Sequence, residues 1–342
     1  MDFTVNLELS PLEIALSGAS YLASLVNDNG RFKYRFDPEA GTDAGGYNVL
    51  RHCGTIWAMM DVYETGEADE EVLAACKRAA IHLQNEFLKL FRAQENLCIL
   101  EGNAIKLGGN ALAILALLSV DKTAKDSLLQ GAIIRLGDFM LALQQPDGDF
   151  IHKQYFRSGK VSSFRSMYYT GEALLALLKL HQACGEKRFL DAVIKCENSL
   201  YPQDYGVKEH SHWMLYSLES LSRLKKKKEH YLHARKIAQH ILDHPDYRDW
   251  GRSTPIACRS EGLLAFLRSA PPTAALKKSG ADAELRRLCL QRVKEDLALQ
   301  LQSRRPEGSF IRGGGDRRHN EVRIDYIQHN ISSFLHYHRM TE

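Results

Sequence analysis

Twelve amphipathic segments, joined by links that alternate between short and long, constrain this sequence more than any other feature. In each segment apolar residues recur at i, i+3, i+4 and i+7, which is the spacing of a helix that buries one stripe. The expected helices cover residues 10–27, 47–65, 69–91, 107–120, 124–144, 165–184, 187–199, 209–224, 228–243, 254–269, 282–302 and 322–338.

The links between these segments alternate in length. After the even-numbered segments most links are short, as at residues 65–68 and 185–186. Long links follow odd-numbered segments at residues 28–46, 145–164 and 303–321. Antiparallel helices joined in this way place all short links on one face of the assembly and all long links on the other. The sequence therefore predicts one plain face and one face built from loops.

The two sets of helices differ in the polarity of their surfaces. The even-numbered segments are apolar nearly all round, as at residues 111–118, and a helix of this kind must be covered on every side. The odd-numbered segments carry a charged face, as Glu70, Glu71 and Lys77 show. We therefore expect a single all-α domain over residues 1–342, an (α/α)6 toroid in which six helical hairpins form an inner and an outer ring. A two-domain helical array is the alternative.

Short motifs add to this pattern. Three long links begin with a turn in which Gly follows a polar residue and Phe comes two positions later, at residues 29–32, 147–150 and 307–310. Gly supplies the positive φ that such a turn needs. Together with YYTGEALLAL at 168–177 and GNALA at 109–113, these turns resemble the α/α-toroid superfamily.

The resemblance covers nearly the whole chain. The superfamily includes six-hairpin glycosidases, N-acylglucosamine 2-epimerases, toroidal polysaccharide lyases and terpenoid cyclases, so the resemblance implies a carbohydrate-active enzyme without naming its substrate. The sequence lacks the DxDD motif, which argues against a terpenoid cyclase.

Composition excludes several classes of function. The formal net charge of +3 is too small to indicate a nucleic-acid partner. The longest apolar stretch, residues 111–120, is shorter than the roughly 20 residues that span a bilayer, so no membrane partner is expected. No secretory signal is visible. The seven cysteines are scattered without a CxxC pair, which we interpret as reduced thiols in the core of a cytoplasmic protein.

Chemistry is expected at the loop face. The inner helices begin there, so six helix amino termini with free N–H groups and partial positive charge surround the mouth of the ring and favour an anion. Polar side chains, scarce elsewhere on these helices, gather in or near their first turns. The candidate substrate-binding residues are Tyr47, Asn48, Arg51, Glu101, Lys106, Tyr168, Tyr169, His212, Trp213, Tyr216, Arg259, Arg323 and Asn330.

Some of these residues have a structural alternative. Asn48 can cap its helix, and His212 with Tyr216, at i and i+4, can belong to the core. Trp250 is expected at the rim of the pocket, where its ring would stack on a sugar face.

The last inner helix carries the densest set of polar residues. Asp325 and His329 are i and i+4 on one face, and Tyr326 and Asn330 are i and i+4 on the adjacent strip. A carboxylate one turn from a histidine can fix the imidazole tautomer and raise its pKa, which prepares it for acid–base work. A buried structural network is the alternative. The candidate catalytic residues are Asp325, Tyr326, His329, His52 and Glu172.

Metal binding is not expected. His210 and His212 are two positions apart and therefore lie on different faces of their helix, which disfavours a zinc pair. The sequence contains no HExxH motif and no paired metal-carboxylate motif. We predict no metal and no cofactor.

The charge of the candidate residues predicts the substrate. Arginines, a lysine and histidines outnumber carboxylates under the converging helix dipoles, so we expect an anionic small molecule or oligosaccharide, such as a uronate-like sugar or glycan. A glycoside hydrolase would place two carboxylates at the scissile bond, with Asp325 opposite Glu172, Glu101 or Glu209.

A lyase or epimerase would instead remove a proton next to a carboxylate or carbonyl group. His329, His52 or Tyr326 would be the base, and Arg51 or Asn48 would neutralise the developing charge. The residues alone favour neither mechanism. A non-catalytic glycan- or peptide-binding toroid, or an interaction scaffold, is the alternative to an enzyme, and it needs no side chain with a strongly displaced pKa.

Overall fold

Helices dominate the chain, which the computed structural model describes over residues 9–92, 96–124, 127–244 and 251–342. The inner helices are α2 (Val49–Tyr63), α4 (Leu107–Ala124), α6 (Tyr169–Cys184), α8 (His212–Leu224), α10 (Ser253–Arg268) and α13 (Ile324–Thr341). The outer helices are α1 (Pro11–Ser24), α3 (Glu70–Phe87), α5 (Ser127–Ala142), α7 (Lys187–Leu200), α9 (Lys228–Leu242) and α12 (Gly280–Leu301). Two short elements, η1 (Tyr201–Gln203) and α11 (Ala274–Lys277), lie in links. Over the described ranges, no helix has both the length and the apolar character needed to cross a membrane.

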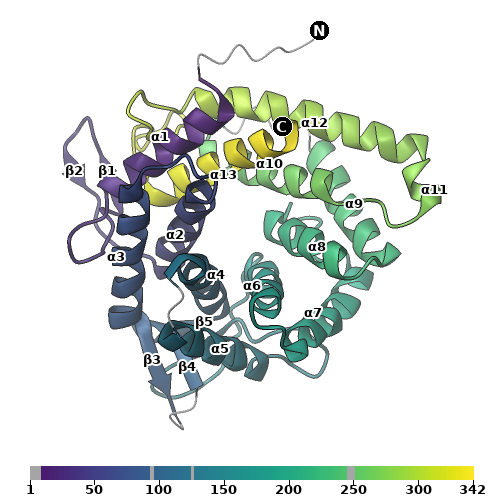
Figure 1. Ribbon diagram of the computed structural model, residues 1–342, viewed down its shortest axis with the longest axis horizontal. Helices are drawn as coiled ribbons and strands as arrows, with labels where there is room; N and C mark the ends of the chain where they lie inside the picture. The colour runs from purple at the N-terminus through teal and green to yellow at the C-terminus, as the bar shows by residue number, and fades with distance from the viewer. Residues whose placement is uncertain (1–8, 93–95, 125–126, 245–250) are drawn as a thin grey trace.

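Each inner helix packs against the next, and the last returns to the first (Figure 1). The order of neighbours is α2, α4, α6, α8, α10, α13 and then α2 again, so the ring is closed. The outer helices surround it: α1 packs against α13 and α2, and α12 packs against α10. The predicted (α/α)6 toroid is confirmed.

Local capping determines where two of the inner helices begin. Asn48 Oδ1 accepts a hydrogen bond from the backbone N–H of Arg51 at 3.0 Å, at the start of α2. Ser211 Oγ accepts one from the backbone N–H of Met214 at 3.3 Å, at the start of α8. Such caps satisfy N–H groups that have no partner inside the helix. Asn48 therefore has the structural role that its sequence context allows.

Small and apolar residues let the inner helices approach closely. A Cβ added to Gly171 of α6 would lie 2.7 Å from the backbone N of Met214 and 2.8 Å from the carbonyl carbon of Trp213, both on α8. Because backbone atoms cannot move aside as a flexible side chain does, the spacing of α6 and α8 requires glycine at this position. In α4 every residue from 111 to 117 is buried, as the all-round apolar pattern predicts.

Two small sheets accompany the helices, and the sequence analysis predicted neither. One has the strand order β2-β1-β7 and the other β3-β4-β5-β6. The strands are β1 (Arg35–Asp37), β2 (Thr42–Asp43), β3 (Leu88–Phe91), β4 (Asn96–Glu101), β5 (Ala104–Lys106), β6 (Lys153–Tyr155) and β7 (Val322–Arg323).

The expected helix over residues 69–91 is too long. α3 ends at Phe87, and the next four residues pair with β4 in an antiparallel register that sets Leu88 opposite Ile99. Apolar residues at 88, 90 and 91 fit a helical period as well as a strand. The pairing partner, distant in sequence, decides between them.

The sheets attach the long links to the starts of the inner helices. β5 leads directly into α4 and pairs with β6, in the link after α5. β7 leads directly into α13 and pairs with β1, in the link after α1. An ion pair of 2.7 Å between Arg305 and Glu39 joins two of the long links. The long links therefore gather at the amino-terminal ends of the inner helices, as their alternation predicts.

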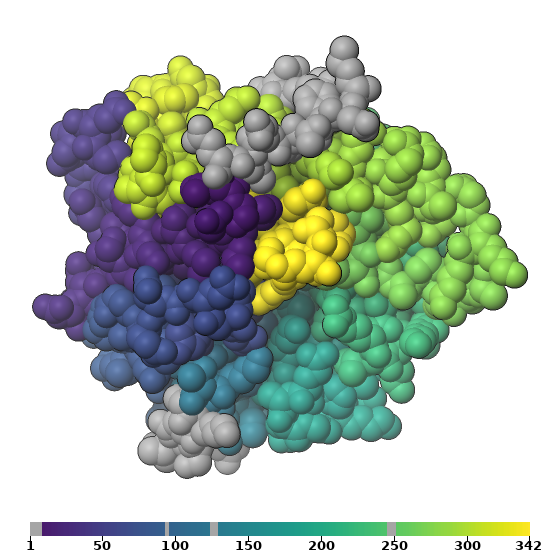
Figure 2. Space-filling view, turned by 45° about the horizontal axis from the view of Figure 1, so that its top comes forward, coloured from purple at the N-terminus to yellow at the C-terminus, as the bar shows by residue number. Residues whose placement is uncertain are grey.

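The surface of the ring is hollowed. Figure 2 shows a depression beside the carboxyl-terminal helix α13, which is drawn in yellow. Most residues that line the hollow belong to the middle and the carboxyl-terminal parts of the inner helices, where the short links join the hairpins.

Candidate functional site

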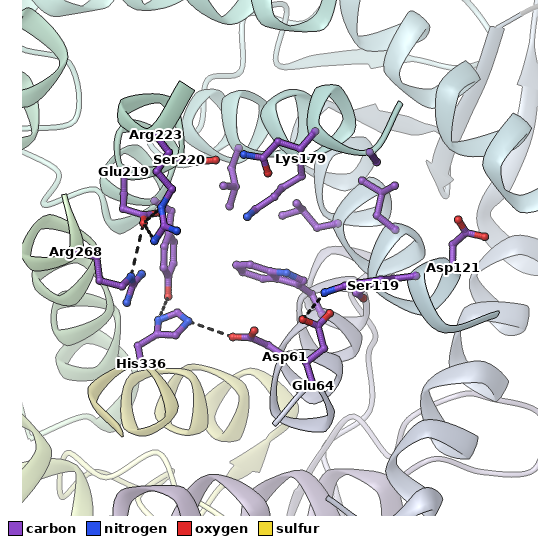
Figure 3. Close-up of a pocket in the computed structure, with 18 of the residues that line it drawn as sticks. Asp61, Glu64, Ser119, Asp121, Lys179, Glu219, Ser220, Arg223, Arg268 and His336 are labelled. Atoms are coloured by element: carbon purple, nitrogen blue, oxygen red, sulfur yellow. Dashed lines mark hydrogen bonds and ion pairs between the residues drawn. The ribbon is translucent and has the colours of Figure 1, made fainter. Parts of the chain in front are cut away.

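A cavity of about 890 Å³ opens at the short-link end of the ring (Figure 3). All six inner helices contribute to its wall. Its polar lining includes Asp61 of α2, Lys179 of α6, Glu219 and Arg223 of α8, and His336 of α13. The sequence analysis placed the pocket at the opposite end, so this cavity is an addition to the expected architecture.

Part of this cavity could have been found from spacing. Trp57 and Asp61 of α2 and the C-cap residue Glu64 stand at i, i+4 and i+7, so they form a stripe at the end of this helix. Cations from neighbouring helices pair with the carboxylates: Arg339 with Asp61 at 2.7 Å, and Lys122 with Glu64 at 2.8 Å. The stripe therefore connects α2 to α13 and α4 across the cavity.

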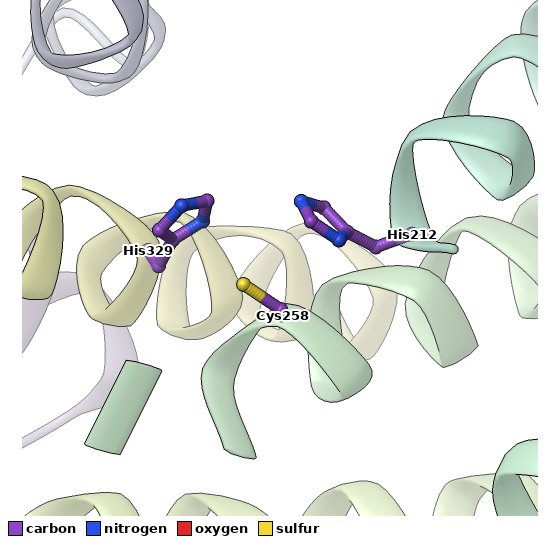
Figure 4. Close-up of side chains that lie close together, drawn as sticks. All are labelled: His212, Cys258 and His329. Atoms are coloured by element: carbon purple, nitrogen blue, oxygen red, sulfur yellow. The ribbon is translucent and has the colours of Figure 1, made fainter. Parts of the chain in front are cut away.

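Three inner helices bring polar side chains together at the loop end. His212 is the first residue of α8, Cys258 lies in α10 and His329 in α13, and their side chains point toward one another (Figure 4). One nitrogen of each imidazole and the sulfur all lie within 4.8 Å of one another. The two imidazole rings are 5.4 Å apart and nearly perpendicular. We refer to these three residues as the His–Cys cluster.

Glu261 holds His329 in place. Its Oε1 lies 2.8 Å from His329 Nδ1, and it stands one helical turn after Cys258 in α10, on the same side of that helix. Burial alone raises the pKa of Glu261, but His329 lowers it below the ordinary value. Burial alone lowers the pKa of His329, but Cys258 and Glu261 raise it well above the ordinary value. The pair is therefore a carboxylate and an imidazolium.

Cys258 differs from most other cysteines of the chain. It is partly exposed, and although burial raises the pKa of its thiol, the neighbouring His329 and His212 lower that pKa to about 6. A thiol of this kind is largely ionised at neutral pH. All seven cysteines are free, and the interpretation as core thiols is wrong for Cys184 and Cys258, which are partly exposed. The fully buried thiols are Cys53, Cys76, Cys98, Cys196 and Cys289.

Glu172 adds a carboxyl group at this end of the ring. It lies in the first turn of α6, it is 4% exposed, and its Oε2 has no hydrogen-bond partner in the described part of the chain. Burial raises the pKa of Glu172 to about 8, against the opposing positive charge of His329. Glu172 is therefore mostly protonated at neutral pH and can donate a proton.

An apolar rim borders the cluster on the side of α6. Four side chains in the segment before this helix are between 40% and 50% exposed: Val161, Phe164, Met167 and Tyr168. The ring of Tyr168 lies 5.9 Å from that of His212, whereas Tyr169 is buried behind it. Exposed aromatic faces suit stacking on the apolar face of a sugar. Trp250, the other aromatic residue expected at the rim, lies outside the described residues.

The hydrogen-bond partners of Asp325 are two arginines, whereas His329 was the expected partner. Its Oδ2 accepts a hydrogen bond from Arg51 Nε at 3.0 Å, and its Oδ1 accepts one from Arg323 Nε at 2.5 Å. The prediction that Asp325 orients His329 is wrong, because two guanidinium groups bind this carboxylate while Glu261 binds the imidazole. The i, i+4 spacing showed that the residues share a face, but not which charges other elements bring to it.

His52 and Tyr47 lie inside the wall of the ring. His52 is fully buried, with Nε2 3.0 Å from the carbonyl oxygen of Ala79 and Nδ1 2.7 Å from Tyr47 Oη. Burial lowers the pKa of His52 to about 3, so the imidazole is neutral. Tyr47 Oη also accepts a hydrogen bond from the backbone N–H of Phe32 at 3.2 Å. These contacts attach the link after α1 to α2 and α3.

Four other candidate residues bond mainly to the structure around them. Tyr326 Oη donates to Glu321 Oε1 at 2.8 Å, and Asn330 Nδ2 donates to the carbonyl oxygen of Tyr326 at 2.7 Å. Lys106 pairs with Glu101 at 2.5 Å. Glu101 Oε1 also accepts a hydrogen bond from the first N–H of α2 at 2.7 Å, so it helps to begin that helix.

Trp213 and Arg259 line the region between the two ends. Trp213 is buried, with its ring 5.8 Å from that of Trp57. Arg259 donates to a backbone carbonyl of its own helix at 2.7 Å. Burial lowers the pKa of its guanidinium to about 10, against the opposing effects of Cys258 and Tyr168. Both residues therefore belong to the wall beside the cluster.

A path of hydrogen bonds connects the His–Cys cluster with the cavity at the short-link end. From Glu261, Oε2 accepts a hydrogen bond from Tyr216 Oη at 2.6 Å. Tyr216 Oη lies 3.1 Å from His336 Nδ1, and His336 Nε2 lies 3.2 Å from Asp61 Oδ2. With the contact between Glu261 and His329, the path runs through the centre of the ring, and Tyr216 stands at its middle.

The structure brings His212, His329, Glu172 and Tyr168 together at the loop end, beside two residues that the sequence did not indicate. These are Cys258 and Glu261, one turn apart in α10. Their i, i+3 spacing in an expected inner helix was the available signal.

Comparison with known proteins identifies the fold. No family model matches the sequence, and no curated protein matches it. The chain is similar to the crystal structure of a sugar epimerase from a ruminal bacterium, with a TM-score of 0.70, 14% identity and coverage of 96% of this chain and 98% of that one. For a D-mannose isomerase the TM-score is 0.70, with 10% identity and coverage of 96% and 97%. For the unsaturated glucuronyl hydrolase of Bacillus sp. GL1 it is 0.69, with 13% identity and coverage of 97% of both chains. The chain therefore has the α/α-toroid fold that these enzymes share.

Proposed function

We propose that this protein is an enzyme that acts on a sugar at the loop end of the ring, by transferring a proton at a carbon next to a carbonyl or carboxylate group. The observation that carries the proposal is a buried carboxyl group with an unpartnered oxygen, Glu172, at the same end of the ring as the His–Cys cluster. Solved structures with this fold include a sugar epimerase and a D-mannose isomerase. Epimerisation, isomerisation and lyase chemistry all begin with this proton transfer.

Glu172 has the properties of the group that moves the proton. Its pKa of about 8 lies close to neutral pH, so the carboxyl group can both give and accept a proton during one turnover. The imidazolium of His329 supplies positive charge for the oxygen that becomes negative as the proton leaves carbon.

Arg51 supports an acidic sugar as the substrate. Its Nε is held by Asp325 at 3.0 Å and its Nη1 by Tyr34 Oη at 2.7 Å, while its side chain is 36% exposed. A guanidinium that is oriented and still accessible binds a carboxylate well. Lys106 is already paired with Glu101, so the preference for a uronate-like sugar depends mainly on Arg51.

Glycoside hydrolysis is the second candidate. Glu172 is protonated near neutral pH, and Asp325, which two arginines bind, is a second carboxyl group of the kind that a glycoside hydrolase uses. Both oxygens of Asp325 already accept hydrogen bonds, however, which weakens it as a base or nucleophile. Proton transfer at carbon therefore stays the first proposal.

Incubating the protein in D2O with aldoses, ketoses, uronates and their disaccharides separates these reactions. Proton transfer places deuterium on the carbon next to the carbonyl or carboxylate group, which NMR of the recovered sugar detects. Hydrolysis releases a new reducing end and leaves that carbon unlabelled. Binding without either reaction would support a non-catalytic toroid.

Two matched variants accompany the exchange experiment. Glu172→Gln should abolish deuterium incorporation, whereas Glu284→Gln, on an exposed face of α12, should leave it unchanged. Equal deuterium incorporation in both variants would show that Glu172 does not take part in the proton transfer.

Salt dependence tests the class of substrate. A uronate should bind more tightly than the matched neutral sugar, and its affinity should fall as salt is added, because the contact with the partly exposed Arg51 is screened. Calorimetric titration over a salt series measures this. Equal affinity for the two sugars at every salt concentration would contradict an acidic substrate.

A further inference from the structure

We propose that the His–Cys cluster binds a zinc ion, with His212, Cys258 and His329 as its three protein ligands. The ion would act in the reaction proposed above, and only this role of the ion rests on the proposed function. Its binding requires no substrate and can be measured separately.

The donor set and its arrangement suit zinc. Two imidazole nitrogens and one thiolate sulfur are ligands that zinc prefers, and here they come from three rigid helices on three sides of one point. Zinc at about 2.0 to 2.3 Å from each atom needs them about 3.5 Å apart. The atoms lie within 4.8 Å of one another, so small side-chain rotations complete the site.

Glu261 provides the outer contact that a metal-binding histidine needs. A ligating imidazole usually donates its other N–H to a carboxylate or a carbonyl group, which fixes the tautomer. Glu261 Oε1 lies 2.8 Å from His329 Nδ1, so Nε2 is the nitrogen left for the metal. Cys258 and Glu261 are one turn apart on one face of α10. Cys258 would bind the ion, and Glu261 would orient His329, another of its ligands.

Several buried polar atoms have no partner in the portion of the chain that the structure describes, and two of them bear on this site. They are Nε2 of His212, a residue that is 3% exposed, and Oε2 of Glu172, which is 4% exposed. Buried polar atoms without partners are rare because they lose their hydrogen bonds to water. A metal ion with a bound oxygen gives an imidazole nitrogen and a carboxyl oxygen partners of the required kind.

Three protein ligands leave a fourth position open, which is the arrangement of catalytic zinc sites. With the ion bound, His329 would be a neutral ligand, and zinc would replace its imidazolium as the positive charge that polarises a carbonyl or hydroxyl oxygen of the substrate. Glu172 would hold or move the proton at the neighbouring carbon, in the role proposed for it above. Cys258 and His329 are partly exposed, so a substrate can approach the cluster.

Cobalt binding tests the site directly. The full chain is freed of metal with a chelator and titrated with Co²⁺, and Zn²⁺ then competes for the site. We expect one ion per chain, the visible bands of a four-coordinate cobalt site and a sulfur-to-cobalt charge-transfer band in the near ultraviolet. Elemental analysis should find one zinc ion per chain after Zn²⁺ replaces Co²⁺.

Matched variants assign the ligands. Cys258→Ser should abolish the charge-transfer band, and Cys184→Ser, a partly exposed thiol outside the cluster, should retain it. Glu261→Gln should retain the band and weaken binding about 10- to 100-fold. Circular dichroism and thermal unfolding check that each variant is folded.

Two outcomes would overturn the zinc site. One is a metal content well below one ion per chain in the folded protein, with Cys258 alkylated equally fast with and without Zn²⁺, which would assign the cluster to a nucleophilic thiolate. The other is a charge-transfer band that survives in Cys258→Ser. Neither readout involves a sugar, so failure of the zinc site is distinguishable from failure of the proposed reaction.

Discussion

Glu172 and His52 are both buried ionisable residues of the inner ring, and their contacts give them opposite properties. His52 has a partner on each ring nitrogen and stays neutral. Glu172 has an oxygen without a partner and titrates near neutral pH. Each is a polar residue in an apolar helix, which made both of them candidate catalytic residues in the sequence. Only the surrounding atoms distinguish a structural group from one available for chemistry.

Replacing Glu172 with Gln should stabilise the protein increasingly as the pH rises. The folded-state pKa of about 8 lies above the ordinary 4.5, so this carboxyl group favours folding fully below about pH 4.5 and loses that contribution as the pH rises through 8. Gln does not ionise. The gain in the free energy of unfolding should grow from near zero at low pH to as much as about 5 kcal/mol above pH 8.

Urea unfolding at several pH values measures this gain. Glu284→Gln, in which an exposed residue paired with Arg287 is changed, should show no comparable growth with pH. A difference between Glu172→Gln and the parent that is constant over pH would contradict the raised pKa of Glu172.

Asp325→Asn should destabilise the ring by about 1 to 3 kcal/mol, because Arg51 and Arg323 lose their shared carboxylate. The effect should fall below that of a fully buried pair, since Arg51 is 36% exposed and solvent screens its charge. Chemical unfolding measures the loss of stability. In the double variant, Arg51→Met should cost less stability than it does as a single change, because its ion pair with Asp325 is already broken. Full additivity of the two changes would show that the ion pair contributes nothing.

The candidate site could be predicted from the sequence in part. His212, His329 and Glu172 stood out because each is polar in the first turns of an apolar helix. Cys258 did not, because a lone cysteine in a helix has the same pattern as a core thiol. The prediction of no metal rested on two histidines of one expected helix, whereas the His–Cys cluster takes one residue from each of three helices. Sequence spacing cannot show which residues meet across a ring.

Among the secondary-structure elements, helices were predictable and strands were not. The period of apolar residues determined each helix within a few residues, because it persists over three or more turns. β3 and β7 are four and two residues long, and they depend on partners that the local pattern does not contain. β7 precedes α13 directly and pairs with β1, so a strand too short to predict helps to place the helix that carries His329.

Gly171→Ala should destabilise the protein by about 1 to 3 kcal/mol, because the added Cβ would meet backbone atoms of α8 at 2.7 and 2.8 Å. It should also lower activity, since Gly171 precedes Glu172 and faces the start of the helix that carries His212. Gly131→Ala is the control: it lies in α5, and its added Cβ meets no atom within 4 Å. Helix propensity should make that variant up to about 1 kcal/mol more stable. Thermal unfolding compares the two, and equal stability would refute the close approach of α6 and α8.

At the scale of the whole molecule, the ring depends on closure. α13 packs against α10 on one side and α2 on the other, and its buried residues include Ile324, Ile327 and Ile331. The hydrogen-bond path from His329 to Asp61 also runs through this helix and connects the two ends of the ring. A single helix therefore completes the core, the cluster and the wall of the cavity.

A chain that lacks residues 324–342 should lose cooperative unfolding, because the facing sides of α2 and α10 would be exposed to water together. Removing only residues 341–342, which are exposed, should leave the transition intact. Calorimetry and urea unfolding compare the two truncations. A sharp transition of unchanged midpoint in the longer truncation would show that five hairpins fold without closure.

Arg51 and Asp325 are 274 positions apart in the chain, yet they form an ion pair across the contact of α2 and α13. During synthesis, the neighbouring hairpins from α3 onward can assemble one after another, each on the helices already made. The flank of α2 that faces α13 has no partner until that last helix leaves the ribosome. Because contacts so distant in sequence form slowly, we expect closure to be the last step in the assembly of the ring. Until then the nascent chain is an open arc with two apolar ends, which is the form that a chaperone would bind.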